Sequence, residues 1–61
     1  MPLYYVDMVN ENKKRTIQLR AKNVKDALNK AHEEVNAKEF VYQISNETTC
    51  LYDYRNGFYK E

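Results

Sequence analysis

The sequence predicts a small α+β domain in which one helix covers one face of an antiparallel or mixed four-stranded sheet. Three observations carry this prediction. Two early segments follow the two-residue period of strands, a middle segment follows the helical period, and two later segments return to the strand period. The element order is therefore ββαββ, and the single helix is expected to pack on one face of the sheet.

The length of 61 residues predicts one compact domain spanning residues 1–61. A chain this short buries only about 60% of the surface that its unfolded form exposes, so its stability is expected to be marginal. Dimerisation or a bound partner would add stability.

The first two strands are expected at residues 3–9 and 16–21, with a polar loop at 10–14 between them. The first segment is rich in strand-forming residues, and the second alternates regularly between apolar and polar residues. Together they predict an antiparallel hairpin. The side chains expected to point inward include Val6, Met8, Ile17, Leu19 and Ala21.

The helix is expected to begin after Asn23, whose side chain can accept a hydrogen bond from a first-turn backbone N–H. Asp26 in that first turn complements the positive end of the helix dipole. Asn36 is expected to end the helix in a left-handed conformation. The apolar residues recur at helical spacing and form one stripe, consisting of Val24, Ala27, Leu28, Ala31 and Val35.

The later strands are expected at residues 40–45 and 48–54, with a tight turn at 46–47. Asn56-Gly57 is a strong two-residue hairpin signal, because both residue types tolerate positive φ. Residues 58–61 are then expected to form either a short fifth strand or a folded-back tail.

The order and length of these elements resemble the β-grasp layout of ubiquitin-like proteins and of the bacterial immunoglobulin-binding domains called protein G and protein L. The resemblance spans nearly the whole chain but rests on element order, and no binding motif of those families matches residue by residue. It implies a fold and no function. It also implies that the first and last strands are central neighbours, which would bring Tyr5 and Leu51 together.

Composition excludes some partners and locations. Ten Lys and Arg against nine Asp and Glu argue against both a polyanionic mimic and a strongly basic nucleic-acid binder. One cysteine excludes an intrachain disulfide, and no apolar run approaches a signal or membrane-spanning segment. The expected location is the reducing cytoplasm, with no membrane partner. The size and the Lys-, Asn- and Tyr-rich composition suit an accessory protein of a bacterium, phage or mobile element.

No catalytic residue, metal ligand or cofactor site is predicted. The only histidine, His32, lies beside the apolar stripe of the helix, and the only cysteine, Cys50, lies in a strand among aromatic residues. No third orienting residue and no CxxC spacing accompanies them. Gly57 is the only glycine, so a glycine-rich phosphate loop is absent from the sequence. The chain is therefore expected not to be an enzyme.

The two faces of the predicted sheet divide the apolar residues. Most tyrosines are expected to face the helix as core residues whose hydroxyls reach the rim. The helix-facing set is Tyr4, Val6, Met8, Ile17, Leu19, Phe40, Tyr42, Ile44, Cys50, Tyr52 and Tyr54. The opposite face is left open, and its apolar residues are either scattered singly, covered by Phe58 and Tyr59, or clustered as an interface. The expected protein interface, for a partner or a homodimer, is Leu3, Tyr5, Val41 and Leu51.

Nucleic-acid binding is the alternative function. Its candidate residues lie at the hairpin tip and along the second strand: Lys13, Lys14, Arg15 and Arg20. These cations would meet a phosphate backbone while Tyr5 stacks on an exposed base. The competing interpretation is a solvated hairpin tip whose charges deter edge-to-edge association of sheets. The expected function is therefore that of a small non-enzymatic binding protein that acts through protein contacts.

Overall fold

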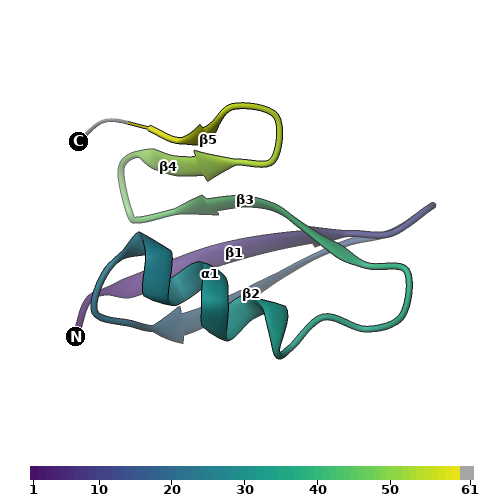
Figure 1. Ribbon diagram of the computed structural model, residues 1–61, viewed down its shortest axis with the longest axis horizontal. Helices are drawn as coiled ribbons and strands as arrows, with labels where there is room; N and C mark the ends of the chain where they lie inside the picture. The colour runs from purple at the N-terminus through teal and green to yellow at the C-terminus, as the bar shows by residue number, and fades with distance from the viewer. Residues whose placement is uncertain (60–61) are drawn as a thin grey trace.

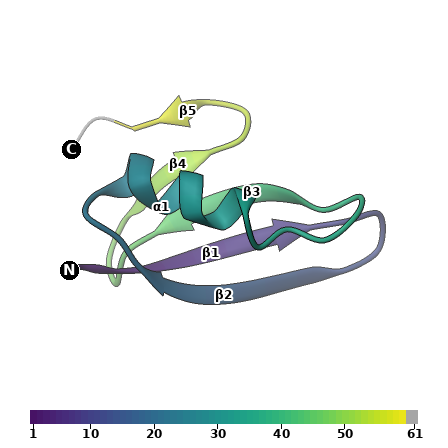
Figure 2. The ribbon, with the colours of Figure 1, turned by 60° about the horizontal axis from the view of Figure 1, so that its bottom comes forward.

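The computed structural model describes residues 1–59 and shows a five-stranded antiparallel sheet with one helix lying across one of its faces (Figures 1 and 2). The predicted fold class is confirmed, including a short fifth strand. The elements are β1 (Leu3–Val9), β2 (Lys14–Arg20), α1 (Val24–His32), β3 (Phe40–Ser45), β4 (Cys50–Asp53) and β5 (Gly57–Phe58).

The strand order is β2-β1-β3-β4-β5, so β2 and β3 flank β1 and the last strands extend the sheet beyond β3. The neighbour relation implied by the β-grasp resemblance is therefore wrong, because β1 pairs with the strand that directly follows the helix. β1 pairs with β3 from Tyr5 to Val9, and β3 pairs with β4 on its other side, so β3 separates β1 from the later strands.

Helix α1 begins where the sequence predicts. The Asn23 side chain accepts a hydrogen bond from the Asp26 backbone N–H, and the Asp26 carboxylate accepts one from the Lys22 N–H, which lowers the pKa of Asp26. The helix ends at His32, before the predicted stop at Asn36. That stop is wrong, since the only non-glycine residue with positive φ in residues 1–59 is Lys38, at 68°.

An irregularity in the β1–β3 ladder changes which face the β3 side chains occupy. Asp7 pairs with Gln43 and Met8 pairs with Val41, so Tyr42 is an extra residue. Val41 therefore lies on the helix side, where it is 4% exposed. Phe40 and Tyr42 lie on the open face, and the strict alternation that predicted the reverse is wrong because a bulge breaks the two-residue period.

A second irregularity, between β3 and β4, moves Leu51 in the same way. Ile44 pairs with Tyr52 and Ser45 pairs with Cys50, so Leu51 is the extra residue. It is 6% exposed and belongs to the core. The predicted placement of Leu51 on the open face is wrong. Cys50 was expected to face the helix, but its ladder partner Ser45 lies opposite Tyr5 on the open face.

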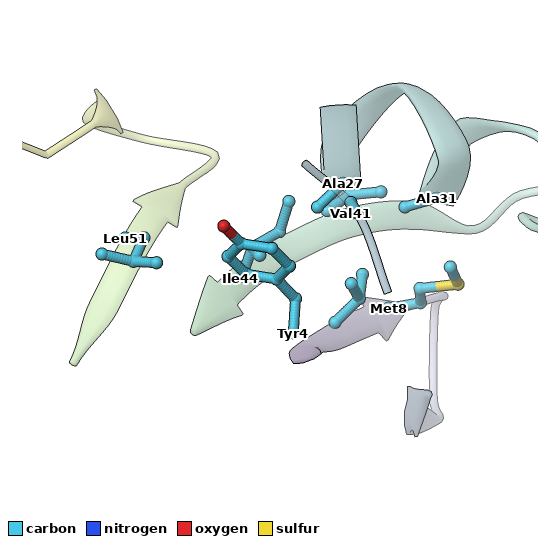
Figure 3. Close-up of a cluster of buried hydrophobic side chains, with 9 residues drawn as sticks. Tyr4, Met8, Ala27, Ala31, Val41, Ile44 and Leu51 are labelled. Carbon is cyan, nitrogen blue, oxygen red and sulfur yellow. The ribbon is translucent and has the colours of Figure 1, made fainter. Parts of the chain in front are cut away.

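The core between sheet and helix is mainly aliphatic (Figure 3). Ala27 and Ala31 are the buried residues of α1, and small side chains let the helix approach the sheet closely. Leu28 is only partly buried and packs at the edge of this cluster. The buried residues are Tyr4, Val6, Met8, Ala21, Ala27, Ala31, Val41, Ile44 and Leu51.

The C-terminal hairpin joins β4 to β5 through three residues instead of the predicted two. Asp53 pairs with Gly57, and the Asn56 N–H donates to the Asp53 carbonyl across the turn. Within this hairpin, Gly57 adopts positive φ, at 76°, and Asn56 does not, as in a type I turn followed by a left-handed glycine. Residues 60–61 of the predicted strand or tail lie outside the described residues.

Candidate functional site

Three aromatic rings meet on the face of the sheet that α1 does not cover. The ring of Tyr54 lies 5.2 Å from the ring of Phe40 and 5.2 Å from the ring of Tyr42, measured between centroids. Phe40 is 43% exposed and Tyr54 is 41% exposed. We call Phe40, Tyr42 and Tyr54 the aromatic cluster. Tyr54 was expected to face the helix, and that placement is wrong.

The cluster is held by the backbone and bordered by two cations. The Tyr54 N–H donates to the Tyr42 carbonyl over 3.0 Å, which fixes the two rings side by side. Lys14 Nζ lies 5.9 Å from the centroid of the Tyr42 ring, and the Arg55 guanidinium carbon lies 5.4 Å from that of Tyr54. Arg55 Nε also donates to the Tyr54 hydroxyl over 2.8 Å. Each cation lies within the range of a cation–π contact.

Leu3 and Tyr5 lie on the open face as predicted. Tyr5 is half-buried and stands between Gln18 of β2 and Ser45 of β3 in the ladder. Leu3 is also half-buried and lies opposite Arg20. The open face therefore carries apolar groups from β1 and β3, together with the tyrosine that follows β4.

Asp7 adds a polar group to the open face, on β1 between Tyr5 and Val9. Its carboxylate accepts a hydrogen bond from the Thr16 hydroxyl over 2.6 Å and lies 3.8 Å from Lys14 Nζ. Both partners belong to β2, so the carboxylate is compensated within the sheet.

The four basic candidates do not form one patch. Lys14 and Arg20 lie on the open face, whereas Arg15 lies on the helix side, because successive side chains of a strand alternate. The Arg20 guanidinium donates to the Met1 carbonyl over 3.1 Å, and Lys13 lies in the exposed loop before β2. Arg20 lies on the open face as predicted, whereas Arg15 lies on the opposite face from Lys14.

Arg15 instead holds the loop that follows α1 through hydrogen bonds to two of its residues. Its guanidinium donates to both carboxylate oxygens of Glu39, at 2.8 and 2.9 Å, and to the Glu34 carbonyl. Glu39 also accepts from the Asn36 N–H, and its side chain is 5% exposed. The Arg15 hydrogen bonds, followed by that of Asn36, lower the pKa of Glu39 to about 2. Sequence reasoning did not single out Glu39, because 24 residues separate the pair.

The reactive side chains are dispersed. Cys50 Sγ lies 3.4 Å from the Tyr52 carbonyl, half-buried in β4, and His32 is exposed at the end of α1. Within residues 1–59, no three His, Cys, Asp or Glu side chains come together as metal ligands.

A surface hollow of about 290 Å³ lies beside the β1–β2 loop and is lined by Asn10, Glu11, Asn12, Lys13, Ala37 and Lys38.

Comparison with known proteins gives no relative: no family model, no curated protein and no solved structure matches this chain. In the part of the chain that the structure describes, no helix has the length and apolar character needed to cross a membrane.

Proposed function

We propose that this chain is a small non-enzymatic binding protein that recognises another protein through its open sheet face. The aromatic cluster is the centre of the recognition surface, with Leu3 and Tyr5 on the same face. One observation carries the proposal: the ring of Tyr54 contacts the rings of Phe40 and Tyr42 on the face of the sheet opposite α1, and Phe40 and Tyr54 are each more than 40% exposed.

The aromatic cluster lies outside the core. The helix-covered face is already filled by its own aliphatic residues, so the cluster does not complete that core. Each Å² of apolar surface removed from water is favourable by about 25 cal/mol, and the entropy lost on association offsets part of this gain. Tyrosine rings lose little conformational entropy on binding, which is why they are common anchors of protein interfaces.

The charges around the cluster define the partner. Lys14 and Arg55 border the rings, and Lys14 also lies 3.8 Å from the Asp7 carboxylate. The partner is therefore a protein that presents an apolar group surrounded by carboxylates, since complementary charge favours encounter and orientation. A second copy of this chain presents the same two cations at the same place and is the less suitable occupant.

The test uses two matched double variants. Phe40→Ser with Tyr54→Ser removes two exposed rings from the cluster, and Phe58→Ser with Tyr59→Ser removes two similarly exposed rings elsewhere. A partner captured from the native cell is purified and titrated with each variant. The cluster variant is expected to bind about tenfold or more weakly, because central aromatic residues contribute most of the binding energy. The control variant is expected to bind as the parent does.

Equal binding by the parent and the cluster variant would contradict the proposal, as would equal losses in both variants. Sedimentation of the purified parent tests the homodimer separately. A dimer that the cluster variant abolishes would make a second copy the occupant of the open face.

Nucleic-acid binding is the alternative, and the positions of Lys14 beside the half-buried Tyr42 and of Arg55 beside the exposed Tyr54 favour it. Single-strand binders combine cations with rings on which bases stack. Binding of a single-stranded oligonucleotide at physiological salt, with an affinity that falls steeply as the salt concentration rises, would favour this function. The ion pairs of Arg15 with Glu39 and of Lys14 with Asp7 argue against it, because two of the four candidate cations already have carboxylate partners.

We also propose a cytoplasmic location and an origin in a bacterium, phage or mobile element. The free Cys50 suits a reducing compartment. The small size and the Lys-, Asn- and Tyr-rich composition support the origin.

A further inference from the structure

The two outer strands of the sheet differ in length and regularity. β5 has two residues, whereas β2 has seven, and its pairing with β1 is continuous from Lys14 to Arg20. Within residues 1–59, no strand pairs with the outer side of β2. Figure 2 shows β2 along the border of the sheet. A long, regular outer strand is a template for pairing with another chain.

The ladder identifies which backbone groups of β2 point outward. The Asn10 N–H donates to the Lys13 carbonyl, and the Ala21 N–H donates to the Pro2 carbonyl. Lys13 and Ala21 therefore both bond toward β1. Because hydrogen-bonded pairs in an antiparallel ladder recur at every second residue, the odd-numbered residues between them, 15, 17 and 19, also bond to β1. The backbone groups of Lys14, Thr16, Gln18 and Arg20 therefore face away from β1. The Arg20 carbonyl indeed accepts a hydrogen bond from Lys30 Nζ, on that outer side.

The helix side of this edge carries two apolar residues beyond Arg15. Ile17 and Leu19 are half-buried and pack against the core, but α1 lies mainly over β3 and β1. Part of each side chain is therefore left beside the free edge. A neighbouring strand would cover them with every second residue of its own.

The edge is also positively charged. β2 contains Lys14, Arg15 and Arg20 and no acidic residue. Arg15 is paired with Glu39 on the helix side of the strand. Lys14 and Arg20 lie on the open face, where Asp7 partly balances Lys14, and Arg20 contacts the Met1 carbonyl and has no carboxylate partner within residues 1–59. A second copy of β2 would bring the same cations to the contact, and like charges on neighbouring strands are destabilising. An incoming strand with carboxylates complements this edge.

From these four observations we infer that the outer edge of β2 binds an extended acidic segment of a partner protein, which adds to the sheet as a further strand. The backbone groups of Thr16 and Gln18 hydrogen-bond to the segment. Its carboxylates lie on the open face near Lys14 and Arg20, and its apolar residues cover Ile17 and Leu19. This site goes beyond the proposed function and does not depend on the aromatic cluster.

The test uses a synthetic peptide of alternating Glu and Val, as long as β2 and blocked at both ends, with a Lys-Val peptide as control. Titration of the isotope-labelled full chain is followed by NMR. The Glu-Val peptide is expected to shift the Thr16 and Gln18 amide signals and to slow their hydrogen exchange. The Lys-Val peptide is expected to bind about tenfold or more weakly.

Gln18 supplies a matched pair of variants. Gln18→Pro removes an outward N–H and keeps the β1–β2 ladder, because proline is tolerated on outer strands, whereas Gln18→Ala keeps the N–H. The proline variant is expected to bind about tenfold more weakly than the alanine variant. If the proline variant does not fold, the double change Lys14→Glu with Arg20→Glu replaces it, and this variant must prefer the Lys-Val peptide.

Three results would overturn the inference. They are no binding of the Glu-Val peptide at millimolar concentration, equal binding of both peptides, and shifts confined to the open face. The variant Phe40→Ser with Tyr54→Ser separates this site from the proposed function. This variant is expected to bind the Glu-Val peptide as the parent does. If it does not bind, the peptide site is the aromatic cluster and not the edge of β2.

Discussion

The two faces of the sheet differ in the type and the exposure of their apolar side chains. The face beneath α1 carries Val6, Met8 and Ile44, each fully buried, whereas the other face carries Phe40 and Tyr54, each more than 40% exposed. A small core packs most densely with compact aliphatic side chains and with alanines that let a helix approach. The rings of the aromatic cluster gather on the face opposite α1.

This difference shows that the abundant tyrosines of the chain are not simply core residues. Tyr4 belongs to the core, but Tyr42 and Tyr54 do not. Exposed rings that contact one another keep a fixed arrangement, and a fixed apolar surface is one that a partner can recognise without ordering it first. Substitutions on the two faces should therefore separate stability from binding.

The largest effect is expected from the covered face. Ile44→Ala removes a fully buried side chain and is predicted to lower the free energy of unfolding by about 2–5 kcal/mol. Urea denaturation measures it, and Gln43→Ala, the neighbouring position on the open face, is the control. Equal stability of the two variants would mean that Ile44 is not a core residue.

A smaller loss of stability is expected from a change in the C-terminal hairpin, at Gly57. Gly57 has a φ of 76°, and an added Cβ would meet no other atom within 4 Å. The cost of Gly57→Ala is therefore conformational and is predicted to be about 1–2 kcal/mol. A thermal melt measures this loss. A variant as stable as the parent would show that the left-handed turn does not form in solution.

The open face is expected to contribute less to stability. Phe40→Ser removes one edge-to-face ring contact and is predicted to cost about 0.5–1.5 kcal/mol. Urea denaturation beside Ile44→Ala checks the order of the two effects. A loss as large as that of Ile44→Ala would place Phe40 in the core and remove the contrast between the faces.

The Arg15–Glu39 pair is expected to make a modest, pH-dependent contribution to the stability of the fold. The pKa of Glu39 is about 2 in the folded chain, below its ordinary value of 4.5. A carboxylate with a lowered pKa stabilises the fold above its unfolded pKa, and this contribution is lost as the pH falls from 4.5 towards 2.

Glu39→Gln removes this titration, because an amide side chain does not ionise in this range. The difference in melting temperature between parent and variant is therefore expected to shrink as the pH is lowered through that window. A difference that stays constant from about pH 5 to about pH 2 would contradict the ion pair, since the parent would then gain nothing from ionising Glu39.

The sequence predicted the elements of this fold better than the placement of individual side chains. The Asn23 cap and the alternation of β1 and β2 follow from local rules, and the structure confirms them. Val41 and Leu51 were misplaced because two ladder irregularities shift the side-chain alternation in β3 and β4. A bulge depends on the partner strand, so alternation within one strand does not reveal it.

The candidate site was predicted only in part for the same reason. Leu3 and Tyr5 lie on regular β1 and were placed correctly, whereas Phe40, Tyr42 and Tyr54 were assigned to the core. Arg15 was grouped with Lys14 by its position in sequence. The pleat of the strand separates the two residues, and the bond from Arg15 to Glu39 is a tertiary contact.

Hydroxyl-radical footprinting of the chain, free and bound to its captured partner, tests the central claim most directly. In the free chain, Phe40, Tyr54, Phe58 and Tyr59 are all exposed and should be oxidised at comparable rates. In the complex, we predict protection of Phe40 and Tyr54 and unchanged oxidation of Phe58 and Tyr59. Protection of Phe40 and Tyr54 already in the free chain, or unchanged oxidation of both in the complex, would contradict the assignment of the open face as the recognition surface.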